Sequence, residues 1–204
     1  MVSKRNEIWT GYAVRFAVVL QWVAGASMMV LLIYGLSTVY ALSLSGFVLM
    51  FTTFSLGIAI GLLWAKHRNV KDFRQAINDV LGLTIVVAFA IVLATFALLN
   101  WLDTIPIAIG YITFSLLAIA TGFCGGASIS FAVLYFASQK QIAKNIKYRS
   151  LFGLGLLGSA IGTVLFSAII VPVFGIMNGA LVVVIILSMA ILLIGTTSQR
   201  KMKS

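Results

Sequence analysis

Side chains that commonly perform catalysis or bind metal ions are few in this sequence. There is one cysteine, Cys124, and one histidine, His67. A disulfide needs two cysteines and a structural zinc site about four Cys or His ligands, so neither forms within one chain. Cys124 stands in an apolar run and is expected to pack as a small hydrophobic residue. His67 stands between two basic residues and is expected to be solvated. The sequence therefore predicts no metal and no cofactor.

Nucleophiles and acids give no catalytic set either. Ser128 and Ser130 lie in an apolar run, where no histidine is available to activate a hydroxyl. A carboxylate in the middle of a membrane segment is the usual sign of a proton pathway. Here every acid lies at or outside the boundary of an apolar run. The four acids are Glu7, Asp72, Asp79 and Asp103. We therefore expect no enzymatic activity and no proton-coupled step at a buried carboxylate.

Long apolar runs form most of the chain. Of the 204 residues, 62% are hydrophobic and only 9% are charged, whereas soluble domains carry about 25% charged residues. A helix of about 20 apolar residues spans the hydrocarbon core of a bilayer. We predict an all-α, polytopic membrane bundle of one domain with six transmembrane helices. Their predicted positions are near 13–35, 41–64, 79–101, 106–137, 150–172 and 178–196.

The basic residues predict the topology. All fourteen Lys and Arg residues fall at the N-terminus, in the segments 65–78 and 138–149, or at the C-terminus. Six spans place all of them on one side, which the positive-inside rule assigns to the cytoplasm. We therefore expect cytoplasmic N and C termini in a bacterial plasma membrane. The two connecting segments form a basic cytoplasmic face of Lys66, Arg68, Lys71, Arg74, Lys140, Lys144, Lys147 and Arg149. Because these charges alternate with apolar runs, we expect no nucleic-acid binding.

The fourth apolar run is longer than one span needs. It covers 32 residues, or about 48 Å as a straight helix. We expect one long helix, continuous or broken within 122–126, whose end protrudes into the cytoplasm. Two short helices would instead give seven spans and place the basic segment 138–149 outside, against the charge rule.

The segment 65–78 has a pattern of its own. Val70, Phe73, Ile77 and Val80 recur at helical spacing with basic residues between them. This pattern fits a short interfacial helix on anionic lipid, and an ordinary basic loop fits it equally.

Glycines predict where helices approach closely. Small residues four positions apart let helix backbones come together in lipid, where packing drives association. The predicted packing positions are Gly57, Gly61, Gly122, Gly125, Gly126, Gly158 and Gly162. They indicate packing within the chain, or smooth faces on which the fourth and fifth helices slide, as transporters require.

The candidate polar residues within the apolar runs are uncharged and only weakly polar. Gln21 is the most demanding, because an amide in the middle of a membrane must find a partner. It would either line a cavity or bond to a neighbouring helix. The candidate cavity-lining residues are Gln21, Trp22, Thr52, Thr53, Ser128 and Ser159.

Two stretches carry a family resemblance: the run from Gly57 to Gly61 before a basic segment, and the glycine-rich 153–162 followed by 171–175. The chain resembles half of a major-facilitator-type bundle, and more specifically the membrane domain of spermidine-synthase-like (polyamine aminopropyltransferase) proteins. The major-facilitator pattern has an acidic residue and a glycine before its basic pair, and these are missing here. The soluble catalytic domain of the synthases is also missing, so the resemblance implies no aminopropyl transfer.

Two functions follow as hypotheses. The first is a half-size transporter-like unit, acting as a homodimer or with a partner, that binds or moves a small uncharged solute. The second is a membrane anchor or scaffold subunit whose basic face docks a soluble enzyme or anionic lipid. The lipid bilayer is the expected partner in both.

Overall fold

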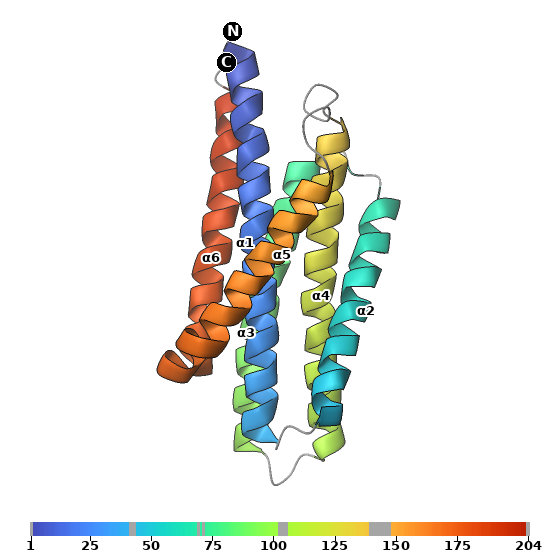
Figure 1. Cartoon of the computed structure of the whole chain (residues 1–204), viewed down its shortest axis with the longest axis vertical. Coiled ribbons are helices and arrows are strands. Elements are labelled where there is room, and N and C mark those ends of the chain that lie inside the picture. The colour runs from blue at the N-terminus through green and yellow to red at the C-terminus, as the bar shows by residue number, and fades with distance from the viewer. Residues whose placement is uncertain are drawn as a thin grey trace.

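The computed structural model is an all-α bundle (Figure 1). It describes residues 2–40, 44–68, 70, 72–101, 106–138 and 148–202, with the side chains of 2–10, 74, 138, 148–151 and 196–202 left out of the description. The predicted all-α membrane-type bundle is confirmed. The elements are α1 Val2–Val39, α2 Leu44–His67, α3 Phe73–Asn100, α4 Ile107–Ser138, α5 Tyr148–Leu165, the π-helix η1 Phe166–Ile170 and α6 Val171–Met202.

The number of separate apolar helices differs from the prediction. Within the described residues, five helical segments are long and apolar enough to cross a membrane, not six. The fifth covers Phe152–Gly195, 44 residues, because η1 joins α5 directly to α6. It therefore contains both of the predicted spans 150–172 and 178–196, and the predicted division between them includes Gly175, where the backbone leaves the helical conformation.

The chain reverses inside this fifth segment at Gly175. Its backbone has φ 80° and ψ 173°, a combination that is accessible essentially only to glycine. Figure 1 shows α5 running away from the end of the bundle at which α1 begins, and α6 returning to it. The start of α1 and the end of α6 therefore lie at the same end, together with the end of α2. We call this the basic end.

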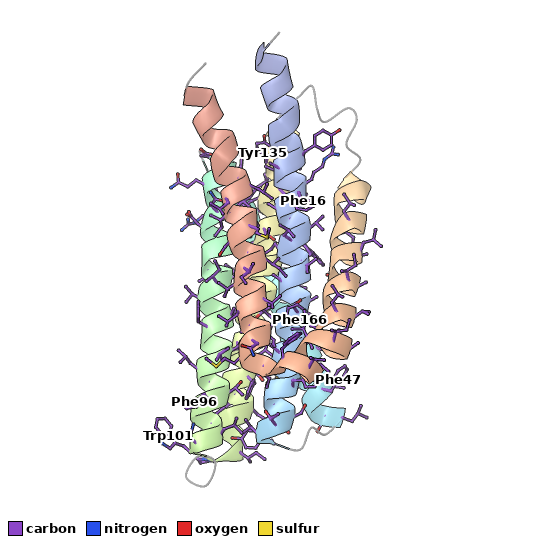
Figure 2. All side chains as sticks on the ribbon, turned by 90° about the vertical axis from the view of Figure 1, so that its left-hand side faces the viewer. Phe16, Phe47, Phe96, Trp101, Tyr135 and Phe166 are labelled. Carbon is purple, nitrogen blue, oxygen red and sulfur yellow. The ribbon has the colours of Figure 1, made fainter. Side chains whose placement is uncertain are left out.

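Helix α1 is the centre of the bundle. It packs against α3, α4, α5 and α6, whereas α2 packs almost entirely on α4 and α5 almost entirely on α1. Its apolar window is accordingly the most buried of the five. Large apolar side chains cover the outside. In Figure 2 Phe96 and Trp101 project outward and are 67% and 60% exposed, whereas Phe166 is 1% exposed. An apolar exterior of this kind suits lipid.

Two boundary predictions have clear outcomes. Helix α4 continues from Ile107 to Ser138, so the prediction of one long helix is confirmed and the break within 122–126 is absent. The separate interfacial helix is wrong, because α3 already begins at Phe73 and continues to Asn100. Ile77 and Val80 are buried in the core, which explains their helical spacing.

Candidate functional site

The most strongly constrained polar group lies between α1 and α3. Gln21 is 1% exposed and Thr84 is fully buried. The Gln21 side-chain amide donates to the Thr84 hydroxyl at 2.9 Å, and that hydroxyl donates to the carbonyl of Val80 at 2.8 Å. These bonds link α1 to α3 through neutral groups, which can position helices but cannot carry charge.

Among the described residues the Gln21 amide is hydrogen-bonded through its nitrogen alone. Its oxygen Oε1 is buried and has no hydrogen-bond partner among the described residues. Within a low-dielectric interior an unpaired amide oxygen has a cost. The sequence singled out Gln21 but not Thr84, because a threonine commonly bonds to its own helix and gives no sign of also accepting from another one.

The remaining cavity candidates do not converge on Gln21. Trp22 faces α5, where its ring lies 6.0 Å from that of Phe152 in an edge-to-face arrangement. Ser128 is fully buried and donates to the carbonyl of Gly125 in its own helix at 2.8 Å. Ser159 is partly buried on α5, which packs against α1 from outside.

Thr52 and Thr53 lie on α2, which scarcely contacts α1. Each donates to a carbonyl of its own helix at 2.8 Å, Thr52 to Val48 and Thr53 to Leu49. Thr52 is exposed on the outer surface, whereas Gln21 is buried between α1 and α3. The six candidates are therefore distributed over four helices and do not line one shared space.

The glycines of α2 and α4 form a reciprocal crossing. A Cβ placed on Gly57 or Gly61 would meet the backbone of Ile119 or Phe123 on α4 closer than 3.0 Å. Gly122 and Gly126 would in turn collide with the carbonyls of Phe54 and Ile58 on α2. Two Gly-xxx-Gly faces thus meet backbone to backbone, the closest packing that helices in lipid achieve.

The crossing has two further features. The Ser130 hydroxyl on α4 donates across it to the carbonyl of Leu62 at 3.2 Å. Gly125 differs from its neighbours, since a Cβ there would meet nothing within 4 Å. Of the three α4 glycines predicted to pack, Gly122, Gly125 and Gly126, the structure therefore places two at the contact and one outside it.

A second glycine face joins α5 to α1. A Cβ on Gly158 would lie 3.0 Å from the Val19 carbonyl oxygen, and one on Gly162 would be closer still to that of Val23. Between α4 and α5 there is at most marginal contact among the described residues. The predicted sliding of these two helices on each other therefore has no extended contact surface in this conformation, because each glycine face packs on a different helix.

The basic face is described only in part. Lys66 and Arg68 are exposed at the end of α2, and the Arg68 guanidinium lies 4.7 Å from the centroid of the Trp64 ring. Arg74 and Arg149 stand in the first turns of α3 and α5. Lys71, Lys140, Lys144 and Lys147 fall outside the described residues. The ends of α2 and α4 and the beginnings of α1, α3 and α5 all lie at the basic end (Figure 1).

One cation at this end was counted in the sequence only as N-terminal charge. Arg15 lies inside the apolar segment Gly11–Val39 and is partly buried. Its guanidinium carbon lies 5.6 Å from the Tyr12 ring centroid and 5.7 Å from that of Phe136. The sequence could have singled out Arg15 by its position, because it lies two residues inside the predicted span 13–35.

No group of three His, Cys, Asp or Glu residues that could hold a metal is present within the part of the chain that the structure describes. No family model, curated protein or solved structure matches the chain. The resemblance to major-facilitator halves and to the membrane domain of spermidine-synthase-like proteins therefore stays a prediction from short glycine patterns. What the helices support is a polytopic membrane protein.

Proposed function

We propose that this chain is a non-catalytic membrane anchor or scaffold subunit of a bacterial plasma membrane, and that its basic end docks an anionic partner. The single observation that supports this choice over transport is the Gln21 amide, which bonds to Thr84 of α3 and is withdrawn from solvent.

A transporter needs a space near the bilayer midplane that is lined by the polarity its helices supply. The polar side chain best suited to that wall instead fastens α1 to α3. The crossing of α2 on α4 and that of α5 on α1 both bring backbones together at glycines, so these helices have little room to separate locally. A closed bundle of this kind suits a protein whose function lies at its surface.

The charge distribution supports the docking half of the proposal. The chain has a net charge of +10, and the described basic side chains Lys66 and Arg68 are exposed at one end. Each basic residue near an anionic surface contributes about 1 kcal/mol of attraction at low screening. A soluble enzyme with an acidic surface would fit this end, and so would an anionic membrane leaflet. That the chain forms a homodimer stays a prediction from the sequence.

Thiol accessibility tests the closed interior. The full chain with Cys124→Ala and Gln21→Cys, reconstituted in liposomes, is treated from either side with a membrane-impermeant maleimide. We expect no labelling, because position 21 is buried. A matched variant with Cys124→Ala and Lys66→Cys should label readily from one side. Labelling at position 21, or flux of small polar solutes above protein-free liposomes, would favour the transporter-like hypothesis instead.

Docking is tested with a defined acidic probe. The full chain in nanodiscs of neutral phosphatidylcholine is titrated with poly-glutamate. We expect binding that weakens from 0.1 M to 1 M salt, because the Debye length falls from about 10 Å to about 3 Å. Absence of binding, or binding that salt does not change, would contradict a docking role for the basic end.

A further inference from the structure

Arg15 is a cation held by aromatic rings at the membrane boundary. It lies four residues inside the apolar segment that begins at Gly11, with the rings of Tyr12 and Phe136 within 5.7 Å of its guanidinium carbon. Its Nε atom is buried and has no hydrogen-bond partner among the described residues. Stacking on rings leaves the in-plane N–H donors of a guanidinium free for another group.

The charge of Arg15 has no ion pair of its own among the described side chains. Asp79, on α3, forms no ion pair with it. Glu7 is eight residues earlier on α1, about 12 Å along the axis. A cation that is partly withdrawn from water is stabilised by an anion that accepts its hydrogen bonds.

Arg68 repeats the arrangement on the other side of α4. Its guanidinium stacks on Trp64 at 4.7 Å, and the Trp64 ring packs in turn against Phe123 at 5.1 Å and Phe131 at 5.8 Å. Phe136, which contacts Arg15, follows Phe131 by five residues on the same helix. Two ring-held arginines therefore flank the last turns of α4 at the basic end, one from α1 and one from α2.

We propose that Arg15 and Arg68 bind the phosphate groups of anionic phospholipids in the leaflet at the basic end. Lipid fits better than an acidic protein because the surface beside Arg15 is apolar: Tyr12 is 59% and Phe16 is 55% exposed. An acyl chain covers such rings while the phosphate meets the guanidinium. The inference rests on the proposed function, since it names one ligand of the basic end.

Native mass spectrometry of the full chain in detergent tests the proposal. Phosphatidylglycerol is titrated against wild type, Arg15→Gln, Arg68→Gln and the control Lys66→Gln, which removes the same charge from an exposed neighbour that no described ring holds. We expect wild type to bind this lipid more tightly than phosphatidylcholine. Each Arg→Gln change should weaken binding about fivefold or more. Lys66→Gln should weaken it by no more than about twofold, because no ring among the described residues orients the Lys66 ammonium, and an unoriented ion pair loses much of its energy to side-chain entropy.

If Arg15→Gln does not fold, Arg15→Lys provides a second test of the proposal. It retains the charge but loses the planar stack, so we expect affinity between those of wild type and Arg15→Gln. Wild-type affinity in both Arg→Gln variants would overturn the proposal, as would an equal loss in Lys66→Gln. Displacement of the lipid by millimolar inorganic phosphate would reassign the arginines to a soluble anion. These outcomes are independent of poly-glutamate binding in neutral nanodiscs, so the two proposals fail separately.

Discussion

The crossing of α2 on α4 allows a matched pair of substitutions on one helix. Gly122 and Gly125 are both in α4, three residues apart. A Cβ on Gly122 would collide with the carbonyl oxygen of Phe54 and lie 3.0 Å from the backbone nitrogen of Ile58. A Cβ on Gly125 would meet nothing within 4 Å. Gly122→Ala therefore forces two helices apart, whereas Gly125→Ala adds a methyl group to open space.

The expected magnitude follows from which atoms are in the way. Inserting a methyl group into a packed contact costs about 1–3 kcal/mol. The obstructing atoms here are backbone, which cannot rotate aside as a side chain does. Alanine also gains up to about 1 kcal/mol over glycine in helix propensity, but both variants share that gain. We therefore expect Gly122→Ala to be less stable than Gly125→Ala by about 1–3 kcal/mol.

Cys124 provides the assay. It is the only cysteine in the chain and is fully buried, so a thiol-reactive fluorescent dye reports unfolding during a thermal ramp in detergent. For a chain of this size 1 kcal/mol corresponds to about 2–4 °C, which places Gly122→Ala about 2–12 °C below Gly125→Ala. Equal melting temperatures would show that α2 and α4 do not approach at Gly122, and would refute the close crossing.

Three further outcomes are expected. Thr84→Val should destabilise by about 1 kcal/mol because it removes the partner of the Gln21 amide, and adding Gln21→Leu should recover part of that loss; purely additive effects in the same thermal assay would argue against the bond. Gly175→Ala should lower stability by about 1–3 kcal/mol although its Cβ meets no atom, because φ 80° strains any other residue; a melting temperature matching the open-space glycine control would contradict this. A reporter fused after Ser204 should read cytoplasmic and one inserted at Thr104 external, as the one-sided charges require; an external reading at Ser204 would show an odd number of crossings.

The sequence by itself determined that the chain is an all-α bundle of membrane type. Apolar runs of about 20 residues and the scarcity of charge leave no other way to satisfy the backbone in lipid. It also indicated the basic end, because every Lys and Arg except Arg15, which lies just inside the first predicted span, falls in a terminal or connecting segment. These properties depend on local composition and on length, which can be read without knowing any contact. The length of the fourth run likewise indicated one long helix, as the structure has it.

Only the tertiary structure decided how the helices meet. The partner of Gln21 is Thr84, 63 residues away, and Gly122 meets α2 while Gly125 meets nothing. Contacts of this kind depend on the rotation of each helix about its axis, which hydropathy does not encode in chains that are apolar on nearly every face. For the same reason the joining of α5 to α6 through η1, the reversal at Gly175 and the ring-held position of Arg15 required coordinates. Packing shape, rather than exclusion of water, selects among such arrangements in lipid.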